Sequence, residues 1–153
     1  MLPTNRSLAV VLAIAVCPSL AHAAIEVKEL PDKVRIEING KLFTEYVHTG
    51  TPHVCYWPLI GPGGAKMTRS WPMAEAPNEE RDHPHHRSLW FSHGLVNGID
   101  FWMEASPSAT KPPKHPIGKI VHSKVLEAKG GAKQGVLKTA QNWVAADGSV
   151  PLT

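Results

Sequence analysis

The sequence predicts an all-β fold, an antiparallel β-sandwich, and two observations support this prediction. Several short segments alternate apolar and polar side chains with a period of two residues, which is typical of half-buried strands. No apolar stripe with the helical period persists for three turns. We therefore expect antiparallel strands joined by tight turns.

The first three strands are expected over residues 25–28, 34–38 and 41–46, where the alternation is clearest. Asn39-Gly40 joins the second of these strands to the third. Asn-Gly between alternating runs is the strongest short-range hairpin signal, because both central residues of a type I′ turn take positive φ. The chain is therefore expected to begin as an antiparallel meander.

Four more strands are expected further along the chain, over residues 53–57, 88–92, 119–127 and 135–140. Segment 88–92 is aromatic and apolar, so we expect a buried strand there. Asp147-Gly148 predicts a hairpin turn whose second arm has barely begun when the sequence stops. Such an arm leaves an open sheet edge, so we expect an N-terminal fragment of a larger domain.

The first 24 residues have the pattern of an export signal. Arg6 gives a positive start, residues 8–16 form an apolar run too short to cross a bilayer, and small residues precede the expected cleavage point. We expect residues 1–24 to be a signal peptide and residues 25–153 to form a single β domain, incomplete at its C-terminus and exported, periplasmic or extracellular. Cleavage leaves Cys55 without a cysteine partner, so it is expected to be a small buried side chain on a strand.

Nearly all of the plausible chemistry lies in residues 82–102. Four of the nine histidines are found there, His83, His85, His86 and His93. Imidazole titrates near neutral pH and is also the commonest metal ligand, so the cluster indicates a proton-handling site or a metal site. Pro84 favours an extended conformation for the residue before it. In an extended segment His83 and His85 share one face, and His86 lies on the other.

The preferred hypothesis is a carbohydrate-binding or carbohydrate-modifying site with no cofactor. It needs a histidine held in one tautomer by a carboxylate such as Asp82, an arginine for an oxygen-rich ligand, and a tryptophan to stack on a sugar face. The candidate catalytic residues are His83, His85 and His86. The candidate substrate-binding residues are Arg69, Arg87, Trp90, Asn97, Asp100 and Trp102.

Two alternatives stay open. The first is a metal-dependent oxidoreductase, an oxygenase, in which His83, His85 and His93 bind a transition-metal ion. A signal cleaved after Ala21 would also place His22 at the N-terminus, an arrangement that copper oxygenases use. The second is a non-catalytic interaction module, whose histidines bond to the backbone and whose tryptophans fill the core.

Charge and hydropathy narrow the expected partners. The net charge of +3 is small, and no basic run of the kind that tracks phosphates is present. No segment after the signal is apolar enough to cross a membrane. We therefore expect a small-molecule or carbohydrate ligand, no nucleic acid and no membrane span.

Several motifs resemble those of the exported bacterial family filed as methane oxygenase PmoA. The longest runs from Asp82 to Phe91, as DHPHHRSLWF, and continues from Val96 to Trp102, as VNGIDFW. The others are Tyr56-Trp57-Pro58-Leu59, Gly61-Pro62-Gly63 and Thr68-Arg69. The resemblance spans residues 40–145. Members of that family are about twice as long, which agrees with an unfinished chain.

That family is in turn similar, at the level of fold, to the β-supersandwich of sugar mutarotases. The resemblance implies that Arg69 and one histidine of residues 83–86 bind and protonate a sugar ring oxygen. It also implies that a glutamate from a missing C-terminal half removes the anomeric proton, so that this chain alone is inactive. The copper subunit of the same name spans a membrane several times, whereas this chain has no such segment after its signal.

Overall fold

The computed structural model describes residues 24–105 and 110–152. All of the expected signal peptide except Ala24 lies outside the described residues, and the export of the chain stays a prediction. His22 also lies outside the described residues, so the alternative in which it becomes an N-terminal copper ligand stays a prediction.

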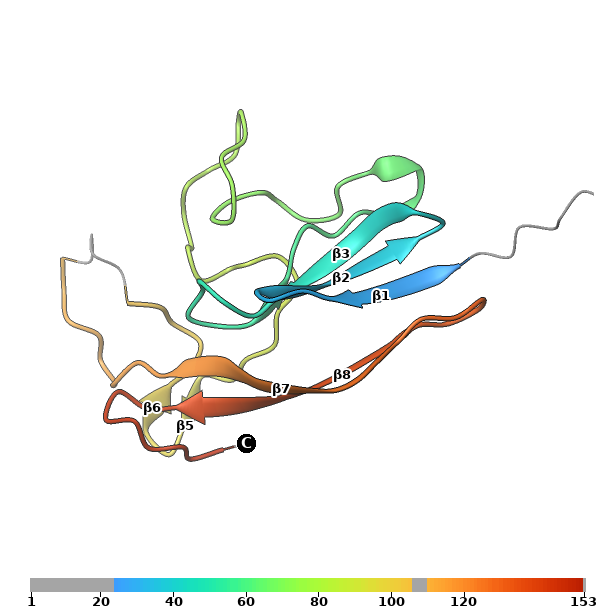
Figure 1. Cartoon of the computed structure of the whole chain (residues 1–153). Helices are drawn as coiled ribbons and strands as arrows, with labels where there is room; N and C mark the ends of the chain where they lie inside the picture. The colour runs from blue at the N-terminus through green and yellow to red at the C-terminus, as the bar shows by residue number, and fades with distance from the viewer. Residues whose placement is uncertain (1–23, 106–109, 153) are drawn as a thin grey trace, which may run out of the picture.

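The strands pair in antiparallel fashion. A four-stranded sheet has the order β1-β2-β3-β4, which is also their order along the chain (Figure 1). Its strands are β1 (Ile25–Glu29), β2 (Lys33–Ile38), β3 (Lys41–Val47) and β4 (Cys55–Tyr56). Two further pairs are β5 (Leu95–Val96) with β6 (Ile99–Asp100), and β7 (Lys119–Lys129) with β8 (Val136–Val144). The all-β, antiparallel prediction is confirmed.

Helical structure is almost absent from the described part of the chain. It consists there of the short 3₁₀ turn η1 (Pro62–Gly64). Among the described residues, no helix has the length and apolar character needed to cross a membrane.

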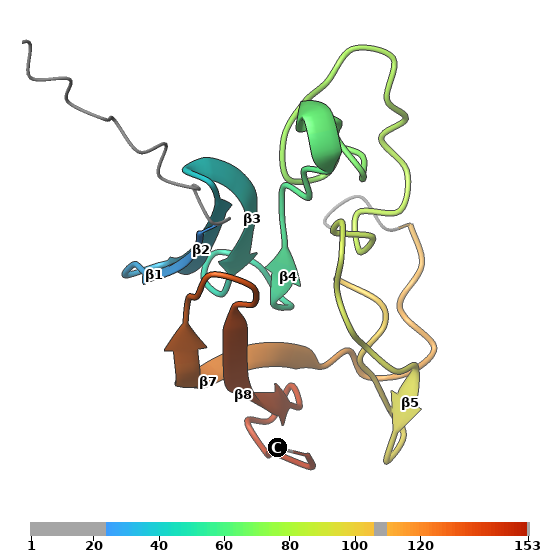
Figure 2. The ribbon, with the colours of Figure 1, turned by 90° about the vertical axis from the view of Figure 1, so that its right-hand side faces the viewer.

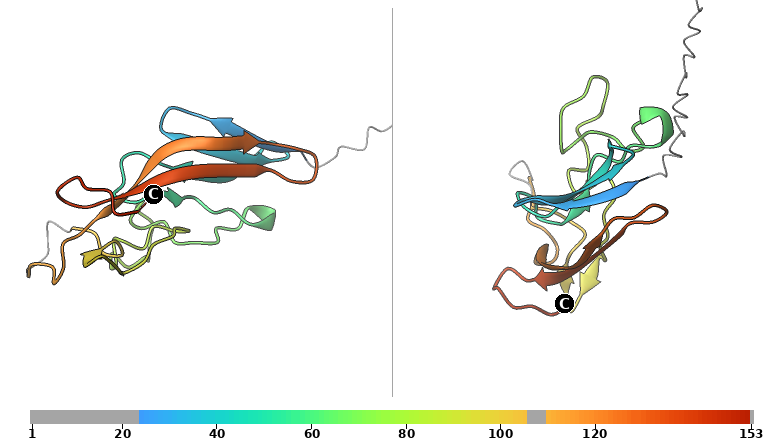
Figure 3. Two further views of the ribbon diagram at one scale, coloured as in Figure 1. Left: turned by 90° about the horizontal axis from the view of Figure 1, so that it is seen from below. Right: turned by 45° about the vertical axis from the view of Figure 1, so that its right-hand side comes forward.

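The sheets pack as two layers. The β7–β8 hairpin lies across the face of β1–β3 (Figures 1 and 3). Backbone bridges join the layers, from Ile25 to Gly131 and from His53 to Ile120. The described residues between β4 and β7, 57–105 and 110–118, lie to one side of both layers (Figure 2). The described residues therefore form a β-sandwich, as the sequence predicts.

Two Asn-Gly turns fix the register of their hairpins. Asn39 and Gly40 have φ of 53° and 70°, and Asn97 and Gly98 have φ of 53° and 80°. Positive φ at both central residues gives a turn whose twist matches the strands that it joins. The sequence predicts the first turn. The second joins β5 to β6 and leaves Asn97 exposed at its tip.

The core lies between the β7–β8 hairpin and the segment that contains β5 and β6. Phe101, Ile120 and Trp143 form its centre, and the Phe101 and Trp143 ring centroids are 4.9 Å apart. Partly buried residues packed against this centre are Val54, Val96 and Ile99. Cys55 is buried in β4, as expected, and burial raises the pKa of its thiol to about 11. The thiol is therefore protonated and unreactive at neutral pH.

One expected strand does not form. The prediction of a buried strand at residues 88–92 is wrong, because Leu89 is 50% exposed and Phe91 is 78% exposed. The segment contributes an isolated bridge between Tyr56 and Leu89. Ser88 has φ of 62°, in the left-handed region that strands do not use. The chain therefore turns where the aromatic run begins.

A polar cluster joins β3 to the β7–β8 hairpin. Gln141 Nε2 donates to Tyr46 Oη over 3.2 Å, and this hydroxyl lies 3.2 Å from His122 Nδ1. The His48 ring stacks on His122, with centroids 4.4 Å apart. Burial, followed by the neighbouring His48, holds the pKa of His122 below its ordinary value, and Glu29 opposes them. The folded protein therefore favours neutral His122.

Acid is expected to weaken this junction. As the pH falls below about 6.5, the ordinary histidine pKa, unfolded His122 takes up a proton while folded His122 resists protonation until lower pH. The free energy of unfolding should fall across that window, and His122→Gln should make the fall shallower. Urea denaturation at about pH 7.5 and about pH 5.5 measures this, with the exposed His115→Gln as control. Equal pH dependence in the wild type and His122→Gln would contradict this account.

Candidate functional site

A tight turn at residues 82–87, the histidine turn, holds the candidate site. The His86 N–H donates to the His83 carbonyl over 2.9 Å, which closes a β-turn with Pro84 at its second position. Proline suits this position because its ring fixes φ at about −65°. His83 has φ of 40°, in the left-handed region. The expectation that residues 83–86 run extended is therefore wrong, since the closed turn overrides the preference that Pro84 imposes on its predecessor.

The turn gathers three imidazole rings. One potential ligand nitrogen from each of His83, His85 and His86 lies within 4.8 Å of the others. The His83 and His86 rings stack with centroids 4.8 Å apart. The His85 ring meets them edge-on, at 5.5 Å from His83 and 4.3 Å from His86. His85 is buried, His86 is half-buried and His83 is exposed, so the cluster opens to solvent on its His83 side.

Arg69 holds the first half of the turn. Its Nη1 donates to Asp82 Oδ1 over 2.6 Å, and its Nη2 donates to the carbonyls of Asp82 and His83 over 2.9 and 3.0 Å. Trp71 Nε1 donates to the same Asp82 carbonyl over 3.0 Å. The hydrogen bond from Arg69 also holds the pKa of Asp82 below its ordinary value. Arg69 thus supports the turn, while its direct role in substrate binding stays a prediction.

Arg87 ties the second half of the turn to a buried carboxylate. Its Nε and Nη2 donate to the two carboxylate oxygens of Glu104, each over 2.7 Å. Glu104 is 8% exposed, and its Oε1 lies 3.4 Å from Nδ1 of the buried His53. Burial alone would raise the pKa of Glu104, but the hydrogen bonds from Arg87 and His53 outweigh it, and the pKa lies below its ordinary value. Substrate binding by Arg87 stays a prediction.

Glu104 and His53 form a buried pair that the sequence does not predict. They are separated by 51 residues in the chain and meet only because the fold brings them together. Their sequence neighbourhoods carry no ligand spacing that would link them. A single histidine such as His53 gives no signal of its own in the sequence, because histidine is found at both buried and exposed positions. Only tertiary structure could reveal this pair.

Trp102 forms an aromatic wall beside the cluster. Its ring centroid lies 6.3 Å from that of His85 and 6.0 Å from that of His86, and the residue is 42% exposed. Trp90 lies against it, with centroids 4.9 Å apart. Asp100 Oδ1 accepts the Trp102 backbone N–H over 2.8 Å and so fixes the backbone that carries the indole.

Two other candidates occupy exposed positions. His93 is exposed and, within residues 24–105 and 110–152, does not belong to the converging group of histidines. Asn97 lies at the exposed tip of the β5–β6 turn, where its positive φ explains its presence. Metal binding by His93 and substrate binding by Asn97 stay predictions.

The environment of His85 favours its neutral form. Burial lowers its pKa most, and the neighbouring His86 and His83 lower it further. Glu104 and Asp100 act in the opposite direction without reversing the shift. A neutral imidazole has a free lone pair, so His85 is ready to act as a base or a metal ligand at neutral pH.

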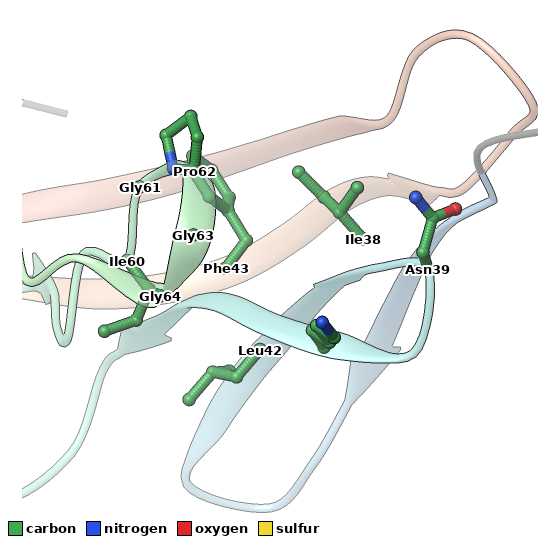
Figure 4. Close-up of a pocket in the computed structure, with 10 residues that line it drawn as sticks. Ile38, Asn39, Leu42, Phe43, Ile60, Gly61, Pro62, Gly63 and Gly64 are labelled. Atoms are coloured by element: carbon green, nitrogen blue, oxygen red, sulfur yellow. The ribbon is translucent and has the colours of Figure 1, made fainter.

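A cavity of about 580 Å³ lies elsewhere, between the β2–β3 hairpin and the loop that contains η1 (Figure 4). Ile38, Phe43 and Pro62 contribute apolar side chains to it, and Lys41 is the charged residue in its lining. The sequence-predicted site residues do not line it. A site that acts on a ligand needs convergent polar groups, so the histidine turn remains the stronger candidate.

The fold and the histidine turn together define an all-β protein with a clustered imidazole site near its surface. Residues 33–153 match a family of unknown function, DUF6807, and the chain belongs to that family. No curated protein and no solved structure matches the chain.

The expected membership of the methane oxygenase PmoA family is wrong, because the family that matches is one of unknown function. The motifs that suggested it lie within the matched residues 33–153. The similarity to sugar mutarotases was expected through that family and is corrected with it. The mutarotase roles of Arg69 and the histidines therefore have no support.

Loss of the Arg69 side chain should loosen the histidine turn. Arg69→Gln removes donors to two turn carbonyls, which should cost about 1 kcal/mol locally and speed hydrogen exchange of the His86 amide about fivefold. Nuclear magnetic resonance measures this exchange residue by residue. The control is Lys138→Gln, which breaks the exposed ion pair of Lys138 with Glu127, far from the turn in the β7–β8 hairpin. An unchanged His86 exchange rate would contradict the role given to Arg69.

Proposed function

We propose that the histidine turn binds a transition-metal ion through His83, His85 and His86. The observation that carries this proposal is the convergence of three potential ligand nitrogens within 4.8 Å. Metal–nitrogen bonds of about 2.0–2.1 Å require tetrahedrally arranged nitrogens about 3.3 Å apart. Small rotations of the exposed His83 and half-buried His86 rings toward the buried His85 would shorten the nitrogen–nitrogen distances from at most 4.8 Å to the spacing that a bound ion requires.

The charges around the turn suit a cation. His83 Nε2 lies 3.6 Å from Asp82 Oδ2, so the carboxylate can orient a ligating ring through its second nitrogen. Glu104 and Asp100 also act on His85, in opposition to the larger effects of burial and the neighbouring imidazoles, and Glu104 is already paired with Arg87.

The donor set selects the class of metal. Three neutral imidazoles suit Zn²⁺, Cu²⁺, Ni²⁺ or Fe²⁺ and are poor ligands for Mg²⁺ or Ca²⁺, which prefer oxygen. Three protein ligands leave at least one position for water or substrate, which is the arrangement of catalytic metal sites. This proposal takes His86 as the third ligand where the sequence hypothesis took His93, because His86 lies with the other two.

A second candidate function is binding of an oxygen-rich ring, such as a carbohydrate. The exposed Trp102 indole beside His85 and His86 favours it, because sugars stack their apolar faces on exposed indoles. Arg69 and Arg87 are engaged by carboxylates of the site, so this candidate assigns the ligand contacts to Trp102 and the imidazoles. Sugar hydroxyls could also occupy open positions on a bound ion.

Metal binding can be tested by titrating the metal-free full chain with Zn²⁺ in a calorimeter. We expect one equivalent to bind to the wild type. Loss of an outer-shell partner typically weakens metal binding about 10- to 100-fold, so loss of a direct ligand in His83→Ala, His85→Ala or His86→Ala should weaken it by at least about 100-fold. His93→Ala is the matched control, since it removes an exposed histidine of the same segment. Wild-type affinity in His85→Ala, or loss of binding in His93→Ala, would contradict the proposal.

The aromatic wall can be tested by tryptophan fluorescence. Monosaccharides added to zinc-loaded protein should quench the emission in a saturable way. Replacement of the indole in Trp102→Ala should weaken the binding about tenfold, whereas Trp102→Phe should retain most of it. Quenching that never saturates, or that is equal in Trp102→Ala and the wild type, would count against a carbohydrate ligand.

A further inference from the structure

We infer that Arg87, held by the buried Glu104, positions the histidine turn for metal binding. This inference rests on the proposed metal site and assigns a role to a residue that does not itself ligate the ion. Arg87 follows His86 directly in the chain, so the position of the Arg87 backbone restricts the position of the His86 imidazole. The Arg87 backbone N–H also donates to the His85 carbonyl over 3.1 Å, within the turn itself.

The guanidinium of Arg87 has one defined orientation. Two of its nitrogens donate to the two oxygens of Glu104 at 2.7 Å each, which fixes the planar group more firmly than a single contact would. Its Nη1 also lies 3.4 Å from Met73 Sδ. A lysine would keep the positive charge but could not donate two parallel hydrogen bonds to the Glu104 carboxylate in this fixed geometry.

Glu104 is itself fixed from the other side. His53 Nδ1 lies 3.4 Å from its Oε1, and His53 is 1% exposed. The backbone of His53 forms a bridge with Ile120 of β7. A continuous series of contacts therefore runs from the β7 strand through His53 and Glu104 to Arg87 and the histidine turn.

The two arginines anchor the turn in different surroundings. The side chains of Arg69 and Asp82 are 29% and 45% exposed, so water and salt weaken their pairing. Those of Arg87 and Glu104 are 16% and 5% exposed, so their pairing is screened much less. The Arg87 side therefore supplies the rigid anchor, and Arg69 closes the exposed side of the turn.

A positioning role is separable from a purely structural one. Both roles predict lower stability when the pair is broken, but only positioning predicts a change in how the ion is held. The affinity for Co²⁺ and the visible spectrum of bound Co²⁺, which depends on coordination geometry, report this directly. Neither quantity responds to stability as long as the protein stays folded.

The test uses the full chain with two changes of the pair. Arg87→Lys keeps the positive charge but loses the pair of parallel hydrogen bonds to Glu104. The double change Arg87→Met with Glu104→Met removes both charges and fills a similar volume with apolar side chains, a replacement that folded proteins often tolerate. The control is Lys138→Met with Glu127→Met, which removes an exposed ion pair of the β7–β8 hairpin. Both changes of the pair should weaken Co²⁺ binding about 10- to 100-fold and alter its spectrum, and the control should do neither.

The outcomes separate the two proposals. Wild-type affinity and spectrum in folded Arg87→Lys and in the double variant would overturn the positioning role and leave the metal site standing. Absence of Co²⁺ binding by the wild type would overturn both. If the variants do not fold, the wild type alone decides: the Arg87 Nε–H resonance should exchange slowly and shift when Zn²⁺ binds. A rapidly exchanging, unshifted Nε–H would overturn the inference.

Discussion

The closed turn from His83 to His86 is the constraint on which the candidate site depends. In an extended strand, alternation would send neighbouring imidazoles to opposite faces. The hydrogen bond between the His83 carbonyl and the His86 N–H, with Pro84 between them, brings all three rings to one place instead. A left-handed His83 is an uncommon conformation, so it persists because the surrounding contacts determine it.

Those contacts come from both sides of the turn and connect it to the core. Arg69 binds the first two carbonyls, and Arg87 reaches the buried Glu104. Glu104 lies three residues after Phe101, whose ring is fully buried against Trp143 of β8. The hydrophobic core therefore holds the segment that carries the aromatic wall and the buried carboxylate against the β7–β8 hairpin. The geometry of the candidate site depends on that packing.

Much of the sheet could be predicted from the sequence, because strands with one buried face alternate and Asn-Gly turns require positive φ. The strand expected at residues 88–92 could not be excluded in this way, since a short apolar run has no period that distinguishes strand from loop. The sequence shows that the histidines cluster in one segment, but it does not show the closed turn that brings three of their rings together. Pro84 favours an extended His83 and also favours a turn that begins at His83. The tertiary contacts of Arg69 with the Asp82 and His83 carbonyls stabilise the turn, and the sequence does not show them. The pairing of Glu104 with His53 has no local signal at all.

The most direct test of the account is whether His83, His85 and His86 share one ion. Side-chain ¹⁵N resonances of the histidines, followed by nuclear magnetic resonance while Zn²⁺ is added to the metal-free chain, distinguish each ring. We expect one nitrogen from each of these three residues to change to a metal-bound shift in parallel, and the changes to be complete at one equivalent. Parallel change in fewer than these three, or in His93 with them, would contradict it.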